Sequence, residues 1–245
     1  MTDHTTAFGA DAAAVSSVAM EGATNYFRWQ LEVMSSHIGP RVLEIGCGVG
    51  EFTRVLLGRE RVVSVDLKSD MIEHVRERMA GHAEWYGLVA DVTDPSLADQ
   101  AEVHRCTSVT AINVIEHIED DEAILAAIRR LLPTGGTAAV LVPAHAALYG
   151  TLDEAAGHYR RYTKSEIARK VEAAGFRVDR TMYFNAVGAI GWYVNYRILR
   201  IRSVNEGTKA QVGVFDKLIV PVARMAERFV EPPFGISAVC LATAV

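Results

Sequence analysis

The chain has 245 residues, of which 50% are hydrophobic and 22% are charged, and its formal net charge is −5. This length and composition fit one sizeable α/β domain with an insertion, and they are small for two full domains. The acidic balance gives no electrostatic basis for binding a nucleic-acid backbone, so we expect no nucleic-acid partner.

The N-terminal segment predicts where the domain begins, and the cysteines predict the cellular location of the protein. Residues 1–20 are small and polar and lack a basic start, so we expect a flexible arm rather than a secretory signal, followed by one domain over residues 21–245. Cys47, Cys106 and Cys240 are far apart and show no metal-binding spacing, which predicts a cytoplasmic location, no disulfide framework and no metal site. No stretch of about 20 residues is continuously apolar, so we expect no integral membrane segment.

Strands and helices are predicted to alternate through residue 142. A helix over residues 26–38 leads into a strand at 41–45, and a glycine-rich turn then opens a helix over 51–58. The next expected strands are 61–66, 84–89, 107–114 and 137–142, and the next expected helices are 69–79 and 121–132. Such alternation implies a parallel sheet with right-handed crossovers, in which ligands bind beyond the carboxyl ends of the strands.

The second half of the chain is less regular and carries two predicted insertions. Residues 144–162 form a loop, and residues 185–233 form a longer segment that begins within a helical stretch from 183 to about 202. A helix over 163–174 and strands over 176–182 and 237–243 complete the domain. The longer insertion has aromatic and apolar residues at helical spacing, which predicts a helical cap. It could line a pocket, form a homodimer contact or rest on a membrane surface, and its Gly and Asn residues favour the first two.

The most informative motif is the sequence VLEIGCGVGEFT at the end of the first strand. Gly46, Gly48 and Gly50 give G-x-G-x-G, whereas dinucleotide sites have G-x-G-x-x-G, and Glu51 stands where the third glycine of that fingerprint belongs. A carboxylate there would face a pyrophosphate, and the turn lacks the Lys-Ser/Thr pair of a P-loop. Together with Glu44 before the turn, the motif favours a ligand that has a cationic end and no phosphate.

This motif resembles the first motif of the class I S-adenosylmethionine-dependent methyltransferases, (V/L)-L-(E/D)-x-G-x-G-x-G. The resemblance extends over residues 26–182 and the last strand, with the later motifs in the family's order and spacing. It implies a Rossmann-like, doubly wound α/β fold with a seven-stranded, mostly parallel sheet, helices on both faces and an inserted helical cap. It also implies S-adenosyl-L-methionine as the cofactor, with Cys47 filling a turn position that needs a small residue.

The resemblance assigns cofactor contacts to the strand ends, although each residue also has a simpler explanation. Asp66 would accept hydrogen bonds from both ribose hydroxyls, or it caps the next helix. Asp91 and Val92 would hold the adenine, or Asp91 closes an Asx-turn. Met71 would pack on the other adenine face, or it fills the core. The strand-end and turn residues expected to bind the cofactor are Glu44, Gly46, Cys47, Gly48, Gly50, Asp66, Leu67, Met71, Asp91, Val92 and Asn113.

The helix before the first strand is the remaining part of the expected cofactor site. In the family this helix often closes over the cofactor, and an aromatic–Arg group there could contact its carboxylate, because the planar guanidinium binds carboxylates well. Tyr26, Arg28 and Trp29 are the residues expected to do so. The alternative is an amphipathic helix that buries its aromatic residues in the core.

A second motif, EHIED at residues 116–120, resembles the E-H-(I/V)-x-D segment of small-molecule members of the family. His117 would be a general base, since the ordinary pKa of histidine lies near neutrality. Alternatively, Glu116 and His117 only shape the loop. In the insertion at 144–162, His158 and Tyr162 could deprotonate or orient an acceptor, unless this stretch is a salt-bridged surface loop.

These patterns predict an enzyme that transfers a methyl group from S-adenosylmethionine to oxygen, nitrogen or carbon of a small molecule, in the manner of bacterial enzymes of secondary metabolism. The catalytic candidates are His117, His158 and Tyr162. A nicotinamide-dependent oxidoreductase shares the fold and an acid at Asp66, but Glu51 argues against it. A non-catalytic S-adenosylmethionine-binding protein is the other alternative.

Overall fold

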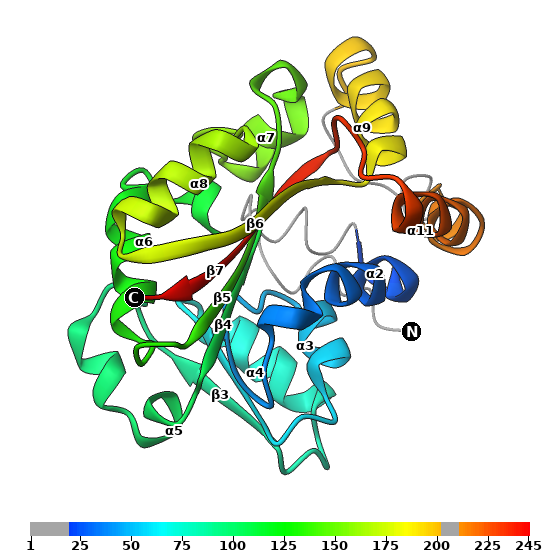
Figure 1. The fold of residues 1–245 in the computed structure, drawn as a ribbon. Helices are drawn as coiled ribbons and strands as arrows, with labels where there is room; N and C mark the ends of the chain where they lie inside the picture. The colour runs from blue at the N-terminus through cyan, green and yellow to red at the C-terminus, as the bar shows by residue number, and fades with distance from the viewer. Residues whose placement is uncertain (1–19, 202–210) are drawn as a thin grey trace.

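The computed structural model describes residues 20–201 and 211–245, so the predicted arm, apart from Met20, lies outside the described residues. Its strands are β1 (Arg41–Ile45), β2 (Arg61–Asp66), β3 (Trp85–Val89), β4 (Ser108–Ile112), β5 (Thr137–Pro143), β6 (Phe176–Phe184) and β7 (Ser237–Ala244). They form one sheet in the order β3-β2-β1-β4-β5-β7-β6 (Figure 1). Only β7 runs antiparallel to its neighbours. The predicted seven-stranded, mostly parallel sheet is therefore confirmed.

Helices cover both faces of this sheet, as predicted (Figure 1). They are α2 (Thr24–Met34), α3 (Glu51–Leu56), α4 (Ser69–Arg78), α5 (Ala101–His104), α6 (Asp121–Arg130), α8 (Lys164–Ala173) and α11 (Val220–Phe229). Helices α2, α3 and α11 contribute to the core on one face, with α4 beside them, and α5, α6 and α8 contribute to the core on the other.

The strand sequences explain why both faces are covered. Val42 pairs in register with Val62, and Leu43 pairs with Val63. The first pair belongs to the core under α2 and α3, whereas the second belongs to the core under α5, α6 and α8. Since successive strand residues point to opposite faces, a strand that is apolar at nearly every position must be buried on both sides.

Capping residues fix where the helices on the second face begin. Asp120 accepts a hydrogen bond from the Ala123 amide at the start of α6. Thr163 accepts one from the Glu166 amide, and the Glu166 carboxylate accepts one from the Thr163 amide, which forms a capping box at the start of α8. These caps place the loops before α6 and α8 at the carboxyl edge of the sheet.

Several predicted boundaries are wrong. Strand β4 ends before Asn113, whose positive φ of 51° is incompatible with extended backbone. Tyr183 and Phe184 continue β6 instead of opening a helix, since both pair with β7. The insertion at 144–162 is not a plain loop but contains the short helices η5 (Ala146–Leu148) and α7 (Thr151–Ala156). The sequence also gave no signal for η3 (Pro95–Asp99) or α5, which are only one or two turns long.

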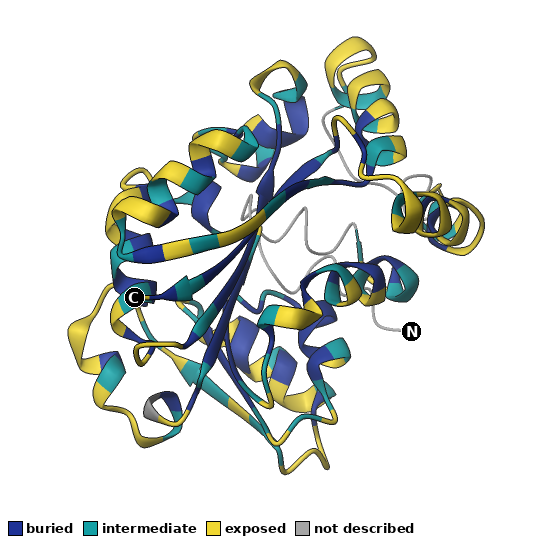
Figure 2. Ribbon diagram, in the orientation of Figure 1, coloured by how far each residue is buried: buried dark blue, intermediate teal, exposed yellow. Residues whose placement is uncertain are grey.

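The second insertion forms a cap of two helical segments beside α2. In the first, α9 (Ala186–Trp192) continues into the π-helical η6 (Tyr193–Ile198); in the second, η7 (Phe215–Ile219) continues into α11. Buried Asp216 fixes the second segment, because its carboxylate accepts hydrogen bonds from the amides of Asn25 and Tyr26. The outward faces of both segments are exposed (Figure 2).

Phe184 connects the sheet to α2, so its removal tests this part of the core. Its ring centroid lies 4.4 Å from that of Trp29 and 5.7 Å from that of Tyr26. We expect Phe184→Ala to lower the free energy of unfolding by about 3 to 5 kcal/mol, because a cavity replaces a fully buried aromatic ring. The control is Phe229→Ala, which truncates a ring that is 79% exposed and should change stability by about 0.5 kcal/mol or less. Urea denaturation measures both; equal losses would contradict this account.

Candidate functional site

A cavity of about 980 Å³ lies beyond the carboxyl ends of β1, β2 and β4. Its wall comes from the glycine turn, from the loops after β2, β3 and β4, from α7 and from both segments of the cap. Ligand pockets usually measure about 300 to 1,000 Å³, so this cavity is at the upper end of that range.

The glycine turn approaches its neighbours so closely that side chains would not fit. Gly46 and Gly50 have φ of 72° and 81°, a region that glycine occupies without strain. A Cβ on Gly46 would lie 2.5 Å from a methyl of Val114, and a Cβ on Gly50 would lie 2.9 Å from a methyl of Val75. The turn therefore presents bare backbone to the cavity, followed by the first turn of α3.

Two carboxylates hold this turn against the sheet. Asp66 accepts hydrogen bonds from the Gly48 amide at 3.1 Å and from the Lys68 amide at 3.1 Å, and it lines the cavity. Glu44 is buried and accepts hydrogen bonds from the hydroxyls of Thr53 and Ser64, both at 2.7 Å. Burial raises the pKa of Glu44 to about 7, although these two hydrogen bonds lower it.

Most of the predicted cofactor residues meet at this cavity. Those that line it are Tyr26, Glu44, Gly46, Cys47, Gly48, Asp66, Leu67, Met71, Asp91, Val92 and Asn113. Asp91 also closes the Asx-turn considered from the sequence, since its carboxylate accepts hydrogen bonds from the amide and hydroxyl of Thr93. The turn leaves Asp91 exposed at the cavity edge, so the two explanations for this residue are compatible.

Four predicted site residues lie outside the cavity lining. Gly50 supports the turn from behind, against α4. Arg28 is exposed, and Trp29 is buried against Phe184 in the core. Tyr162 is also buried: its hydroxyl donates a hydrogen bond to Asp121 at 2.9 Å, and burial together with this carboxylate raises the pKa of Tyr162. Its geometry is that of a structural tyrosine, which leaves His117 and His158 as the catalytic candidates that face the cavity.

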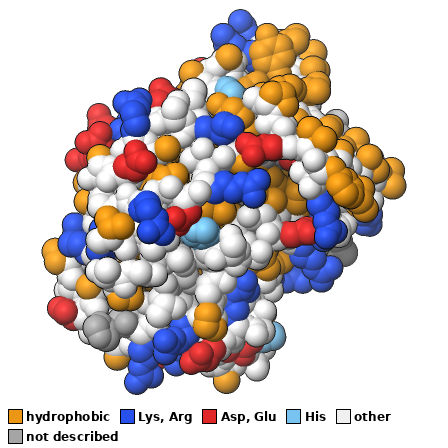
Figure 3. All heavy atoms as spheres, in the orientation of Figure 1, with side chains coloured by type: hydrophobic (Ala, Val, Ile, Leu, Met, Phe, Trp, Pro, Cys, Tyr) orange, Lys and Arg blue, Asp and Glu red, His pale blue; other side chains and the backbone are white. Residues whose placement is uncertain are grey.

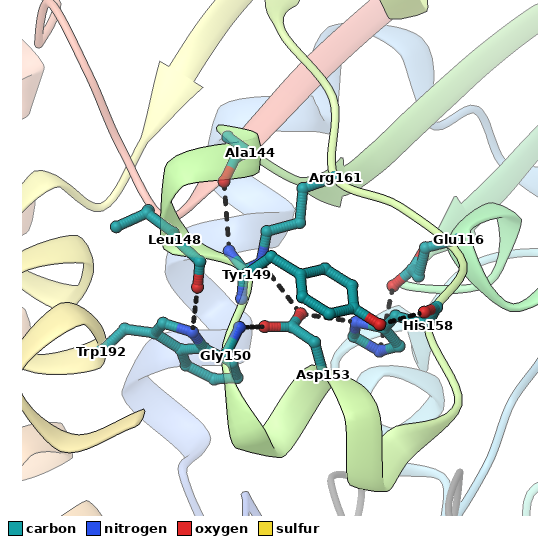
Figure 4. A network of polar contacts seen from close by, with 9 residues as sticks. All are labelled: Glu116, Ala144, Leu148, Tyr149, Gly150, Asp153, His158, Arg161 and Trp192. Carbon is teal, nitrogen blue, oxygen red and sulfur yellow. Dashed lines mark hydrogen bonds and ion pairs between the residues drawn. The ribbon is translucent and has the colours of Figure 1, made fainter. Parts of the chain in front are cut away.

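A polar network around Asp153 and Arg161 supports His158, which lines the cavity (Figure 4). The Nδ1 atom of His158 lies 2.8 Å from Oδ1 of Asp153, and the same oxygen accepts a hydrogen bond from Nε of Arg161 at 2.9 Å. Burial alone would raise the pKa of Asp153, but the hydrogen bond from His158 and the charge of Arg161 outweigh it and lower the pKa. Asp153 is therefore a buried anion that fixes the ring of His158 and turns Nε2 away from itself.

Glu116 lies on the other side of the His158 ring. Its Oε1 atom is 4.0 Å from Nε2 of His158, and neither carboxylate oxygen has a hydrogen-bond partner although the residue is fully buried. Burial raises the pKa of Glu116 to about 7, against the lowering effect of His158. A buried carboxylate without partners is costly, so the group needs a proton, a cation or a ligand that donates a hydrogen bond.

The rings of His117 and His158 pack edge to face, with centroids 4.6 Å apart. With Glu116 they offer three ligand atoms that lie within 4.8 Å of one another. Two histidines and one carboxylate can hold a zinc or iron ion, so the expectation of no metal needs a direct test.

The sequence predicted some of the residues around His158 as site residues, but not all of them. From the sequence, Glu116 is a candidate for shaping its loop and Asp153 falls in a stretch that could be a salt-bridged surface loop, yet both are fully buried and lie close to His158. Trp192 of the cap had no assigned role, and its ring stacks under the Arg161 guanidinium at 4.7 Å. The many charged residues near His158 in the sequence indicate a polar site. Which of them pair with one another depends on how α7 folds, and the sequence does not show this.

Glu116→Gln tests whether this carboxylate is buried without a partner. Because the pKa of Glu116 is raised in the folded state, its protonated form favours folding, and stability should fall as pH rises from about 4.5 to about 7. We expect the variant to match the wild type at pH 5 and to be more stable by about 2 to 3 kcal/mol at pH 8, measured by urea denaturation.

The control for this comparison is Glu119→Gln, which removes an exposed carboxylate in the same loop. It should show the wild-type dependence of stability on pH. Equal slopes for the wild type and Glu116→Gln would mean that the carboxylate has a partner in solution.

Comparisons with known proteins agree with this fold. Residues 24–181 match a family described as "Methyltransferase domain". The chain is 35% identical over 103 residues to a malonyl-[acyl-carrier protein] O-methyltransferase of Serratia marcescens, covering 42% of this chain and 38% of that protein. It is 28% identical over 120 residues to a ubiquinone biosynthesis O-methyltransferase of Methylococcus capsulatus, covering 47% of this chain and 48% of that protein. The matches thus span less than half the length of these curated relatives.

Among solved structures, the fold resembles that of the 1,6-didemethyltoxoflavin-N1-methyltransferase of Burkholderia thailandensis, solved with 1,6-didemethyltoxoflavin and S-adenosylhomocysteine. The TM-score is 0.56 at 18% identity, and the alignment covers 93% of this chain and 78% of that chain. At this identity the likeness concerns the fold alone. The family match ends at β6, so the cap lies largely outside it.

Proposed function

The chain belongs to the methyltransferase domain family and has the fold of the class I S-adenosylmethionine-dependent enzymes, and we propose that it transfers a methyl group from S-adenosyl-L-methionine to a small-molecule acceptor. The observation that carries the proposal is one cavity that joins the bare glycine turn and Asp66 to a supported histidine. Both curated relatives named above are O-methyltransferases, which supports oxygen as the acceptor atom.

The cofactor would lie over the glycine turn. Asp66 is half-buried and lines the cavity at the end of β2, where its carboxylate would accept hydrogen bonds from ribose hydroxyls, and Asp91, Val92 and Met71 also line the cavity. Glu51 lines the cavity and pairs with Arg78, its Oε1 atom 2.5 Å from Nη2, so a carboxylate stands where a dinucleotide would need a glycine beside its pyrophosphate. A phosphate-free nucleoside fits these residues better than a dinucleotide.

When bound, S-adenosylmethionine supplies an electrophilic methyl group on a sulfonium. The protein then has to align the acceptor, exclude water and take up a proton if the acceptor carries one. His158 is the first candidate for taking up the proton, because it lines the cavity and Asp153 holds its Nδ1 atom, while its Nε2 atom lies 4.0 Å from the Glu116 carboxylate. His117 lies beside it and is the second candidate. Asp153 acts as a positioning residue.

Calorimetric titration with S-adenosylhomocysteine and with NAD tests the cofactor assignment. We expect S-adenosylhomocysteine to bind and NAD not to bind. We further expect Asp66→Ala to weaken S-adenosylhomocysteine binding about tenfold or more, because a charged acceptor of hydrogen bonds is lost. Asp70→Ala, at an exposed position in the first turn of α4, is the control and should leave the affinity unchanged. Tight NAD binding would instead favour the oxidoreductase alternative.

Turnover of His158 variants tests the base. With an acceptor found by mass spectrometry of products from a metabolite extract, we expect His158→Gln to lower kcat by about 10²-fold or more at neutral pH. S-adenosylhomocysteine affinity should stay near the wild-type value, since His158 lies on the acceptor side. His117→Gln is measured in parallel, and Tyr159→Phe, at an exposed neighbouring position, is the control.

These assays contain a chelator and are repeated with added zinc or iron. Activity that survives chelation leaves Nε2 of His158 available as a base, whereas activity that depends on the added ion makes the histidines ligands. If both His158→Gln and His117→Gln keep the full rate across the pH range, the assignment of a base is wrong. Failure to find any methylated product would favour the non-catalytic alternative.

Location and assembly are further proposals. The three cysteines are free and buried, which supports a reducing cytoplasm as the place of action. The described residues contain no helix that is long and apolar enough to cross a membrane. The homodimer expected from the sequence stays a prediction, and light scattering of the purified protein measures it.

A further inference from the structure

Most of the exposed large hydrophobic side chains in the described part of the chain belong to the cap. In the segment formed by η7 and α11, the side chains of Leu218, Val222, Met225 and Phe229 are 66%, 70%, 58% and 79% exposed. Their spacing of four, three and four residues places them in one stripe along the helix. Figure 3 shows hydrophobic side chains gathered over α9 and α11. Large exposed stripes of this kind mark interaction surfaces.

The other cap segment repeats the pattern. Val187, Ile190, Val194 and Ile198 of α9 and η6 are exposed and again follow a spacing of three, four and four residues. We call the two stripes together the cap face. It is made of the eight residues Val187, Ile190, Val194, Ile198, Leu218, Val222, Met225 and Phe229.

Basic residues border the cap face. Lys217, Arg224 and Arg228 each precede a stripe residue directly in the sequence, so they form a row about 100° around the helix from it. Arg197 and Arg200 occupy exposed positions at the end of the first segment. All five are exposed, in a chain whose net charge is −5.

Two of the three acids in the described part of the cap are turned inward. The Asp216 carboxylate binds the amides of Asn25 and Tyr26, and the Glu227 carboxylate binds the amides of Asn185 and Ala186. The third acid, exposed Glu231 at the end of the cap, pairs with Lys164 and Arg180, and Arg224 pairs with Glu32 of α2. The basic residues beside the apolar stripes are therefore only partly neutralised by acids.

We propose that the cap face docks on the surface of a membrane that contains anionic lipids. Apolar side chains on one face of a helix with basic residues beside them are the pattern of interfacial helices, which insert the apolar side chains at the level of the headgroups and attract anionic lipids with the basic ones. A second copy of the chain fits less well, because a twofold contact would bring the basic rows of two cap faces together.

Docking on a membrane would bring the cavity close to acceptors dissolved in the bilayer. This part of the inference rests on the proposed function. Val187 and Ile190 belong to the cap face and also line the cavity. Phe215 and Ile219 line it from the second segment. The wall of the acceptor side is thus continuous with the docking surface, so an apolar acceptor dissolved in the bilayer would reach the cavity without crossing water.

Vesicle sedimentation tests the docking with the full-length protein. Phosphatidylcholine vesicles with and without phosphatidylglycerol are compared at low and high salt. We expect binding to the anionic vesicles, weaker binding at high salt and little binding to phosphatidylcholine alone. The double variant Val222→Glu, Phe229→Glu should lose binding, and Lys217→Gln and Arg228→Gln should each weaken it about fivefold. Equal binding of the wild type and the double variant, or no binding of the wild type to anionic vesicles, overturns the proposal.

The matched control places two glutamates at exposed apolar positions outside the cap, in the double variant Tyr86→Glu, Val245→Glu. It should bind vesicles like the wild type. Light scattering tests whether the cap face is instead an interface between two copies of the chain. If the wild type is a dimer and the double variant Val222→Glu, Phe229→Glu is a monomer, the membrane proposal is overturned. Titration with S-adenosylhomocysteine separates the two proposals, since vesicle binding without cofactor binding leaves the docking standing and rejects the function.

Discussion

The absence of Cβ atoms in the turn after β1 is the constraint on which the site depends. Gly46 and Gly50 pack so closely against Val114 and Val75 that the turn is held against the loop after β4 and against α4. Asp66 then reaches the Gly48 amide from the end of β2. The backbone, the carboxylate and the loop after β4 thereby share one cavity, and any larger residue in the turn would separate them.

The two buried glutamates of the site differ in their hydrogen-bond partners, and this difference sets their roles. Burial raises the pKa of both Glu44 and Glu116 to about 7. Glu44 has two hydroxyl donors and holds the turn, so its cost of burial is offset within the protein. Glu116 has none and faces His158, so its cost is offset only by a proton, a cation or a ligand. Unsatisfied polar groups of this kind mark the part of the site that interacts with something else.

The cap connects the cavity to the outside of the molecule. Its acids bind backbone amides of α2 and of the β6–α9 junction, which fixes the cap on the body, while its apolar side chains face both the cavity and the solvent. Under the proposed function, the methyltransferase fold would supply the cofactor side, whereas α7 and the cap would supply the acceptor side. A fold does not by itself define a substrate, so the substrate specificity of this chain would then reside in these two insertions.

The sequence alone predicted the glycine turn and the strands and helices that alternate through residue 142, because these follow from glycine spacing and local periodicity. The strand order and the antiparallel direction of β7 came only from the structure. The sequence also placed Asp66, Asp91 and Asn113 at one edge, since the carboxyl ends of parallel strands meet there. Only the tertiary structure decided which side chains of α2 face the cavity: consecutive residues differ by about 100° around a helix, so Tyr26 and Phe27 line it while Arg28 and Trp29 do not. Likewise, the contact of Tyr162 with Asp121 and the approach of Glu116 to His158 join residues about 40 positions apart, and no local pattern encodes such a pairing.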